Sequence, residues 1–392
     1  MASILSINGG SSSIKFAFYG GGDPLVRGLH GSVGRIRQSG VHLTFNRATE
    51  TRQNYVSFAP SAQRSVASSL IDWLEAQPEF ASINAIGHRI VHGMQHAASA
   101  RVDEILLQEL RRISPYHSEH LPSAIKLIEA LAERHPKLAQ IACFDTSFHH
   151  NMPRIAQLLP LPRRFDAKGM RRFGFHGLSY AYLIEQLERI GDPAATRGRV
   201  ILAHLGNGAS LAAVRNGHSI DTSMGFSPTS GLMMSSRSGD LDPGLVYYLA
   251  RTERMTAAQF HRMVNRESGL LGVSETSSDM RDLIALAVTD QRAAEAVALF
   301  CYQAKKTLGA FTAVLEGLDT LVFSGGIGEH LPSIRQRICD GLSFLGIELD
   351  PIRNLQNAAV ISSDASRASV RVIATDEEVM IARSVRRTLA SV

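Results

Sequence analysis

One short sequence pattern occurs twice in the chain, and the two copies lie about half the chain length apart. Residues 5–21 read LSINGGSSSIKFAFYGG, and residues 201–217 read ILAHLGNGASLAAVRNG. The copies align without gaps at an offset of 197, so that Gly9 matches Gly206 and Ser13 matches Ser210. Each copy reads as a strand, a polar glycine-rich bend and a second strand, which predicts a hairpin. Two such hairpins in 392 residues predict a duplicated architecture with two related halves.

Both bends offer backbone N–H groups in place of bulky side chains. Gly9–Ser13 and Gly206–Ser210 are suited to wrapping an anion, because glycine permits a close approach of the backbone. Asn8 adds a side-chain ligand for phosphate or Mg²⁺. The chain contains no Gly-Lys pair and therefore no G-x-x-x-x-G-K-[ST] loop, so any phosphate is bound by other means.

Composition and charge exclude several classes of protein. Hydrophobic residues make up 44% and charged residues 20% of the chain, as in ordinary globular proteins. We expect no membrane span, since no apolar run reaches about 18 residues. We expect no secretion signal, since the first residues show no basic region followed by an apolar core and a cleavage site. The net charge of +5 is scattered, which argues against nucleic-acid binding. Three widely spaced cysteines favour a reducing cytoplasm over a disulfide framework or a zinc site.

Beyond the hairpins, the pattern alternates short apolar strands with amphipathic helices, which predicts an α/β protein. The expected strands are 85–93, 141–150 and the start of 319–330. The expected helices are 64–77, 103–113, 122–135, 178–190, 244–251, 256–265 and 291–316. Polar residues follow several of the strands, at the sheet edge where open α/β sheets bind ligands.

The segment GHRIVHG, residues 87–93, allows two interpretations. On a helix, the spacing of His88, His92 and His96 would suit a metal. The stretch is short, β-branched and bounded by glycines, so we favour a strand, which places Arg89 and Val91 on one face. A guanidinium beside a small apolar side chain suits a short carboxylic acid. The alternative is an arginine held in a structural ion pair.

Other candidate residues carry weaker signals. Asp145 ends the strand in IACFDTSFHH and could coordinate Mg²⁺ or orient a carboxyl group. His176 lies between glycines and aromatics in FGFHGLSY, where a histidine is more often a satisfied core residue. Arg237 lies in the turn-rich segment MMSSRSGDLDPG, where a surface arginine is common. The glycine-rich turn of FSGGIGEH follows a strand and suits a nucleotide.

These motifs together resemble the acetate/propionate kinase family, part of the superfamily of sugar kinases, heat-shock ATPases and actin. The matching segments include INGGSSSIKF, GHRIVHG, FDTSFHHNMP, RRFGFHGLSY, HLGNGAS, DTSMGFSPTSGLMMSSRSGDLDP, SGGIGEH and ATDEEVMIAR. They occur in family order from residue 4 to residue 383, so the resemblance covers almost the whole chain.

The resemblance implies two duplicated actin-like ATPase (ribonuclease H-like) domains that face a central cleft. The first would comprise residues 1–149, completed by the C-terminal helix at about 376–392, and the second residues 150–375. The implied activity is Mg²⁺-dependent transfer of the γ-phosphoryl group of ATP to acetate, giving acetyl phosphate and ADP. Mn²⁺ would serve as an alternative metal, and the family is typically a cytoplasmic homodimer.

The resemblance also implies roles for individual residues. The magnesium group would comprise Asn8, Asp145 and an acid of the TDEE segment, Glu377 in preference to Glu378. Arg89 and Arg237 would clamp the carboxylate and the phosphoryl group. His176 would donate a hydrogen bond to the transition state. The implied acyl pocket comprises Val91, Tyr116, Phe175 and Pro228. His117 matches a family histidine near the site. The implied ATP-binding residues are Lys15, His204, Gly206, Asn207, Gly208, Asp279, Met280, Arg281, Gly326, Ile327, Gly328 and Glu329.

Several positions depart from the usual family pattern, in SPYHSEH, HGM, GLSY and GEH. Tyr116 borders the implied acyl pocket, Tyr180 replaces a family histidine, and His330 lies near the implied adenosine. A propionate- or butyrate-preferring kinase is therefore one alternative. An ATPase or nucleotide sensor of the heat-shock type is another, although it would not require Arg89, Val91 and Arg237 together.

Overall fold

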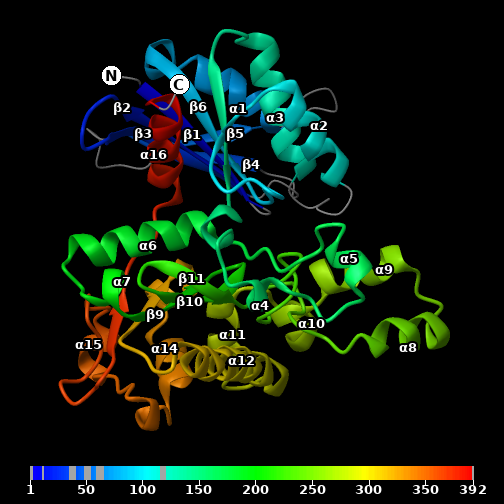
Figure 1. Cartoon of the computed structure of the whole chain (residues 1–392), viewed down its shortest axis with the longest axis vertical. Helices are drawn as coiled ribbons and strands as arrows, with labels where there is room; N and C mark the ends of the chain where they lie inside the picture. The colour runs from blue at the N-terminus through cyan, green and yellow to red at the C-terminus, as the bar shows by residue number, and fades with distance from the viewer. Residues whose placement is uncertain are drawn as a thin grey trace. The chain divides into compact units, whose positions relative to one another are not determined.

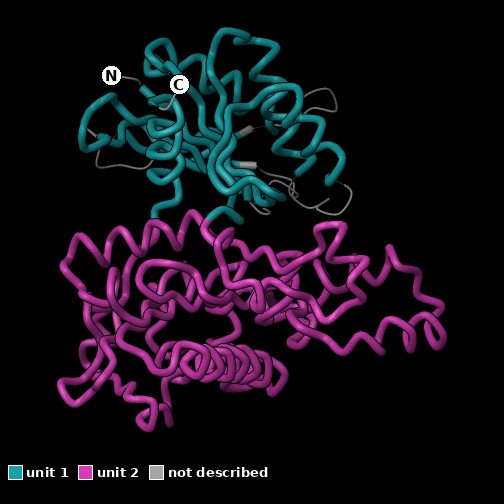
Figure 2. Tube along the Cα trace, viewed as in Figure 1, with its two compact units in different colours: residues 1–147, 376–392 teal, residues 148–375 magenta. Residues whose placement is uncertain are grey.

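The chain forms two compact units in the computed structural model, which describes residues 3–10, 13–34, 41–47, 54–58, 66–114 and 121–390. Unit 1 contains residues 1–147 and 376–392, and unit 2 contains residues 148–375 (Figure 2). Each unit is built on its own sheet (Figure 1).

Within the described part of unit 1, eight strands form a sheet in the order β5-β4-β3-β2-β1-β6-β8-β7. β1 to β5 are antiparallel to their neighbours in that series, whereas β1, β6 and β8 run parallel. The strands are β1 (Ser3–Gly9), β2 (Ser13–Gly20), β3 (Val26–Gly34), β4 (Val41–Asn46), β5 (Asn54–Phe58), β6 (Ile83–Ile90), β7 (Ala100–Arg101) and β8 (Ala139–Phe144).

Helices cover both faces of this sheet. The helices of unit 1 are α1 (Val66–Glu75), α2 (Glu104–Ile113), α3 (Leu121–Arg134) and α16 (Glu377–Ala390). α1 and α3 bury their leucines against one face, beside Ile86 of β6. The next residue, Gly87, faces α16, since a side-chain carbon there would lie 2.4 Å from Ile381 Cγ2. Glycine at position 87 thus lets the C-terminal helix pack directly on the strand that carries Arg89.

The sheet of unit 2 repeats the central pattern of unit 1. Its strands are β9 (Arg199–Leu205), β10 (Ala209–Arg215), β11 (His218–Thr222), β12 (Thr320–Ser324) and β13 (Ser369–Val372), in the order β11-β10-β9-β12-β13. β9 to β11 form an antiparallel meander, and β9, β12 and β13 run parallel. The series β3-β2-β1-β6-β8 has the same directions, so the predicted duplication is confirmed and extends to five strands.

The helices of unit 2 enclose its sheet. α6 packs its apolar residues, including Leu183 and Leu187, against β9, β10 and β12, and α12 also contacts β10. The helices are α4 (Arg154–Gln157), α5 (Arg163–Asp166), α6 (Gly177–Arg189), α7 (Ala194–Arg197), α8 (Gly244–Thr252), α9 (Ala257–Arg262), α10 (Gly269–Ser274), α11 (Met280–Leu286), α12 (Gln291–Leu315), α13 (Gly325–His330), α14 (Pro332–Cys339) and α15 (Pro351–Leu355). No helix among the described residues is long and apolar enough to cross a membrane.

The predicted strands were right in kind but too long. The strand expected at 85–93 ends at Ile90. Val91 therefore lies outside the strand, and the alternation of side chains along a strand does not place it on the same face as Arg89. The strand expected from 141 ends at Phe144, and short 3-10 turns follow. The helix expected at 256–265 ends at Arg262 and continues as a π-helical turn, Met263–Glu267. Apolar runs do not show where backbone pairing stops, which explains these errors.

Candidate active site

A charged cluster lies at the carboxyl ends of β6 and β8 in unit 1. Arg89 is the penultimate residue of β6, and Asp145 follows β8 directly. Because these strands are parallel neighbours, both residues reach the same edge of the sheet. Arg89 Nε donates to Asp145 Oδ1 at 3.0 Å, and Nη2 donates to Oδ2 at 2.6 Å. This two-point contact fixes the orientation of both side chains.

Asn8, near the end of β1, connects this pair to α16. Its Oδ1 accepts a hydrogen bond from Arg89 Nη1 at 3.0 Å. Its Nδ2 donates to Glu377 Oε2 and to Glu378 Oε1, each at 2.8 Å. Glu377 Oε2 also lies 3.5 Å from Arg89 Nη1. Asn8, Arg89, Asp145 and Glu377 are therefore brought together, as the sequence predicted, and Glu378 joins them.

The cluster carries an excess of negative charge. Taken by themselves, the Arg89 guanidinium and the carboxylates of Asp145, Glu377 and Glu378 give a formal sum of 1 − 3 = −2, while Lys15 and Arg27 line the adjoining pocket with Glu378. Burial by itself lowers the pKa of Arg89, but the Asp145 and Glu377 carboxylates raise it, and the net pKa lies above the ordinary value. Arg89 therefore stays charged, and the excess negative charge calls for a cation.

The donor set fits Mg²⁺. Glu377 Oε2 and Glu378 Oε1 converge on the same nitrogen of Asn8, and carboxylate oxygens are ligands that Mg²⁺ prefers. Mg²⁺ usually binds one or two protein carboxylates and completes its shell with water and substrate phosphate. Among the described residues, no group of three or more His, Cys, Asp or Glu is arranged as a metal site. An open two-carboxylate site is thus the kind of magnesium site this geometry supports.

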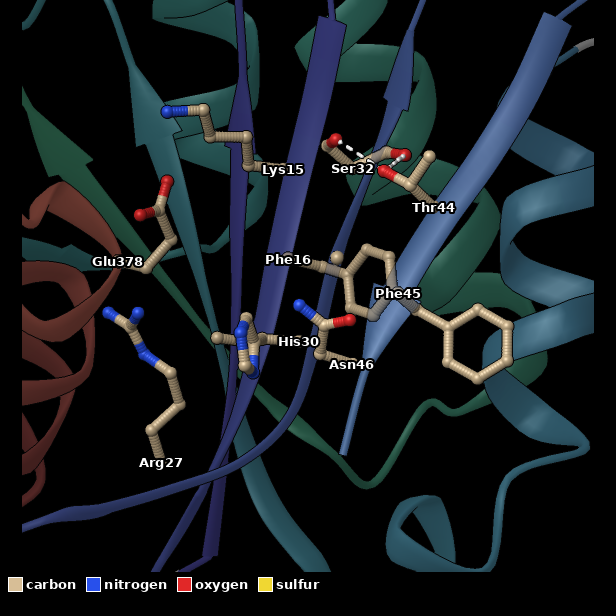
Figure 3. A pocket seen from close by; sticks show the side chains of 11 residues that line it. Lys15, Phe16, Arg27, His30, Ser32, Thr44, Phe45, Asn46 and Glu378 are labelled. Carbon is tan, nitrogen blue, oxygen red and sulfur yellow. Dashed lines mark hydrogen bonds between the residues drawn. The ribbon is translucent and has the colours of Figure 1, made fainter. Parts of the chain in front are cut away.

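A shallow pocket of about 200 Å³ adjoins the cluster. Lys15 lines it from β2, Glu378 from the start of α16, and Arg27 and His30 from β3. Figure 3 shows the Lys15 ammonium and the Glu378 carboxylate on the same side of the pocket. Arg27 is held by Asp376, whereas Lys15 is exposed at the surface of unit 1 and accessible to an anion.

A second cluster surrounds the bend between β9 and β10 in unit 2. The bend is closed by a hydrogen bond from Gly206 N to Gly208 O at 3.0 Å. A side-chain carbon on Gly208 would lie 3.0 Å from His176 Nε2 and 3.7 Å from Arg237 Nη1. Glycine at position 208 therefore leaves room for both groups, and the structure brings three predicted residues to one point.

His176 is held rigidly beside this bend. It precedes α6 with φ = +59°, in the left-handed region, and its side chain is buried. Its ring stacks on that of His204, with 4.4 Å between centroids. Its Nδ1 lies 2.8 Å from Ser210 Oγ, and His204 Nδ1 lies 2.9 Å from Ser179 Oγ. Both histidines are thus fixed by stacking and by hydroxyl groups.

Arg237 reaches the bend from the long loop that follows β11. Ser235 in this loop donates its backbone N–H to Asn207 O at 3.3 Å, which ties the loop to the bend. Arg237 Nη1 donates to Pro228 O at 3.1 Å. Arg237, Pro228 and Asn207 therefore belong to one connected group.

Gly326, Ile327, Gly328 and Glu329 lie in a short helix, α13, where the sequence predicted a turn. The helix starts directly after β12 because Glu329 Oε1 accepts the N–H of Gly325 at 2.8 Å. The same oxygen accepts the N–H of Thr375 at 3.2 Å. A side-chain carbon on Gly206 would lie 3.8 Å from Gly326 N, so α13 begins beside the bend.

Arg335 supports α13 from beneath and was missed by the sequence analysis. Its side chain is fully buried. Nη1 donates to the carbonyl oxygens of Gly328 and Glu329 at 2.8 and 3.0 Å, and Nε donates to Asn354 Oδ1 at 2.8 Å. Burial lowers the pKa of Arg335 to about 10. An arginine in an amphipathic helix gives no sequence signal of burial, which explains the omission.

The remaining predicted residues belong to several elements of the two units. Asp279 caps α11 and binds Arg281, whose Nη2 lies 2.6 Å from Asp279 Oδ2, while Met280 is buried. The hydrogen bond from Arg281 lowers the pKa of Asp279. The predicted apolar residues Val91, in unit 1, and Phe175, in unit 2, are both buried. Tyr116 and His117 lie outside the described residues.

A family model and curated relatives match the chain over nearly its whole length. The model described as the acetokinase family matches residues 3–383. An acetate kinase of Rhodopseudomonas palustris strain TIE-1 is 44% identical over 98% of each chain. A propionate kinase of Citrobacter rodentium is 40% identical over 98% of this chain and 96% of the relative.

Solved structures match equally widely. A propionate kinase from Francisella tularensis superposes with a TM-score of 0.90 at 34% identity, covering 98% of this chain and 99% of the other. An acetate kinase from Porphyromonas gingivalis gives a TM-score of 0.86 at 32% identity, covering 99% and 100% of the two chains. The duplicated actin-like ATPase fold that the sequence predicted is thereby confirmed.

Proposed function

The chain belongs to the acetokinase family, and from this premise we propose that it transfers the γ-phosphoryl group of ATP reversibly to acetate. An acetate oxygen forms a bond to the γ-phosphorus while the bond from that phosphorus to the bridging oxygen of ADP breaks. The electron pair leaves with ADP, and the products are acetyl phosphate and ADP. No phosphorylated protein residue takes part in this direct, in-line transfer.

The observation that carries the proposal is that the hydrogen bonds of Arg89 within the protein use only some of the N–H groups of its guanidinium. An arginine has five N–H donors, and the pair with Asp145 and the contact to Asn8 use Nε, one N–H of Nη2 and one of Nη1. Among the described residues the other two N–H groups make no hydrogen bond, although Nη1 also lies 3.5 Å from Glu377 Oε2, and they can donate to a carboxylate or phosphoryl oxygen. Asp145 and Asn8 hold this fork in place, so its orientation is set before the substrate binds.

Asp145 acts through Arg89 in this proposal and is not a general base. Acetate is already an anion and needs no deprotonation to attack phosphorus. Phosphoryl transfer therefore depends on positioning and on neutralising charge. Arg89 on the acceptor and Arg237 on the phosphoryl group offset the repulsion between two anions, and removing one such group costs about 2–4 kcal/mol of transition-state stabilisation.

Glu377 and Glu378 would hold Mg²⁺, with Mn²⁺ as an alternative. The metal supplies charge neutralisation at the phosphate oxygens. Glu377 is our first choice of ligand, and Asn8 keeps both carboxylates oriented.

His176 and Arg237 would stabilise the phosphoryl group during its transfer, since both approach the bend at Gly208. Successive N–H groups at Gly206, Asn207 and Gly208 would bind phosphate oxygens. The further ATP-binding residues would be Lys15, His204, Asp279, Met280, Arg281 and the residues of α13 from Gly326 to Glu329.

Acetate is the proposed acceptor, with propionate as the second candidate. A propionate kinase stands among the relatives at 40% identity, so closely related chains carry either name. The proposed acyl pocket comprises Val91, Tyr116, Phe175 and Pro228. A cytoplasmic location suits the three free, buried cysteines.

A homodimer accounts for a feature of unit 2 that the single chain leaves unexplained. Helix α8 has no buried residue, and Val246, Tyr247 and Tyr248 expose large apolar surfaces. An isolated helix of nine residues is unstable in water, since lengths of about 12–15 residues are marginal. A second copy of the chain covering α8 would stabilise it, and sedimentation should give twice the mass of the chain.

The test is ATP-dependent formation of acyl phosphate, trapped with hydroxylamine, from formate, acetate, propionate and butyrate in the presence of Mg²⁺. We expect the highest kcat/KM with acetate. A maximum with propionate or butyrate would retain the mechanism and change the substrate. No acyl phosphate from any acid, in folded protein that binds ATP, would contradict the proposed function and favour an ATPase or sensor.

A further inference from the structure

A chain of three polar side chains leads from the interior of unit 2 to His176. His176 Nδ1 lies 2.8 Å from Ser210 Oγ, and Ser210 Oγ lies 2.5 Å from Tyr180 Oη. Ser210 follows the glycine bend on β10, and Tyr180 lies on the first turn of α6, four residues after His176. Ser210 and Tyr180 are both fully buried.

The phenol of Tyr180 keeps its proton. Burial raises the pKa of Tyr180 well above its ordinary value, and the hydrogen bond with Ser210 offsets this only in part. In the part of the chain that the structure describes, Ser210 Oγ is the hydrogen-bond partner of Tyr180 Oη. A buried hydroxyl proton without an acceptor is costly, by about 1–3 kcal/mol. The phenol therefore donates to Ser210.

The direction of the second hydrogen bond follows from counting protons. A serine hydroxyl has one proton and accepts through its lone pairs. With its oxygen accepting from Tyr180, Ser210 directs its own proton to His176 Nδ1. That nitrogen must then be an acceptor, so the imidazole proton lies on Nε2. The reverse direction, from Nδ1–H through Ser210 to Tyr180, would leave the phenol proton without a partner.

We propose that Tyr180 and Ser210 are positioning residues that lock His176 in the Nε2–H tautomer. Nε2 is the nitrogen that faces Gly208, at 3.0 Å from the position of a side-chain carbon there. The hydrogen-bonded chain from Tyr180 through Ser210 to His176 thus keeps an N–H donor directed at the glycine bend in every turnover. An imidazole in the other tautomer would present a lone pair to a phosphoryl oxygen and repel it.

Arg237 and His204 lie around the His176 ring. Arg237 Nη1 approaches the same point of the bend, so a positive charge already faces His176 there. His204 stacks on the ring, with its own Nδ1 bound to Ser179. His176 Nδ1 itself lies within hydrogen-bond distance of Ser210 Oγ.

Neutron diffraction from crystals of the wild-type protein tests the tautomer without any variant. We expect deuterium on His176 Nε2, none on Nδ1, and the Ser210 deuterium directed at Nδ1. Deuterium on Nδ1 alone would overturn the proposal. This readout does not depend on turnover, so it remains valid if the proposed acetate kinase activity fails.

A kinetic test of the tautomer, which rests on the proposed function, uses the variant Tyr180→Phe. Ser210 can then accept from Nδ1–H, so both tautomers become populated. We expect kcat to fall about tenfold with little change in KM, below the factor of about 10²–10³ for losing a donor outright. Tyr182→Phe removes the same oxygen from the same helix and should leave kcat unchanged. Equal kcat values for the two variants would overturn the proposal. If Tyr180→Phe does not fold, Ser210→Ala gives the same comparison.

Discussion

The two glycine bends follow corresponding strands, β1 and β9, but have different chemical surroundings. The bend after β1 is joined to a set of charges, in which Arg89 faces Asp145, Glu377 and Glu378. The bend after β9 is surrounded by neutral hydrogen-bonding groups and one arginine, Arg237. Duplication of the fold therefore did not duplicate the chemistry.

This difference suggests a division of tasks. A cluster with a formal charge of −2 attracts a divalent cation and keeps one guanidinium oriented. A bend lined by N–H donors and a guanidinium attracts phosphate oxygens. In the proposed reaction, unit 1 would handle the metal and the acceptor, and unit 2 the phosphoryl donor.

Removing Arg89 should have the largest effect. We expect Arg89→Ala to lower kcat/KM by about 10³-fold or more, since both the substrate contact and the orientation are lost. It should also lower the free energy of unfolding by about 3–5 kcal/mol, because the buried carboxylate of Asp145 loses its two-point contact with the guanidinium. Arg111→Ala is the control, as this arginine forms exposed ion pairs on α2 and should leave both quantities near wild type. Activity of Arg89→Ala within tenfold of wild type would refute its role.

Acid should weaken both units in the same pH range. Burial lowers the pKa of His88, in unit 1, and of His149, in unit 2, to about 4. Between pH 6.5 and 4 only the unfolded chain takes up these protons, so stability present above pH 6.5 is lost as the pH falls. Each histidine should cost about 3 kcal/mol over this range.

Urea unfolding at several pH values measures this loss. His88→Gln should be less stable at pH 7 but should lose less stability on acidification than the wild type. His218→Gln, at an exposed position, should follow the wild-type curve. Parallel curves for His88→Gln and wild type would show that His88 titrates normally in the folded state.

The space at the second bend can be tested with one methyl group. Gly208→Ala places a carbon 3.0 Å from His176 Nε2, whereas Gly206→Ala meets its nearest neighbour at 3.5 Å. We expect Gly208→Ala to lower kcat about thirtyfold through displacement of His176, within the range for losing a transition-state donor. Gly206→Ala should retain most activity. If both variants behave alike, the role assigned to the approach of His176 is wrong.

Replacing Glu377 or Glu378 should have smaller effects than the changes above, and the size of the effect should differ between the two residues. Glu377→Gln should raise the Mg²⁺ concentration for half-maximal activity about tenfold, and Glu378→Gln less, as for residues that orient metal ligands. Glu133→Gln, exposed on α3, controls for the loss of one negative charge. A larger shift for Glu378→Gln would transfer the ligand role to Glu378.

The fold was predictable where residue types force a conformation. The hairpins were found because glycine and serine mark their bends. The remaining strands of the five-stranded repeat carry different residues in the two units, such as INAIGHRI in β6 and TLVFS in β12, so the repeat could not be found there from the sequence. Strand ends were misjudged at Val91, since an apolar residue continues the pattern after pairing has stopped.

The site was predictable as a list of residues and only partly as an arrangement. Placing Arg89 and Asp145 at strand ends followed from the pattern, but their two-point pairing depends on neighbouring parallel strands. The ion-pair alternative for Arg89 is thus present in the structure, and its substrate role stays a prediction. Arg335 could not be found, and Tyr180 was noted only as a departure from the family pattern, because burial of a polar side chain leaves no periodic signal.

The most direct test of the proposed mechanism follows the configuration at phosphorus. The wild-type protein would convert acetate and ATP made chiral at the γ-phosphorus with three oxygen isotopes, and the configuration of acetyl phosphate would be determined. A single in-line transfer between the two anions predicts inversion. Retention would require two displacements, and therefore a phosphorylated intermediate, which would contradict the account.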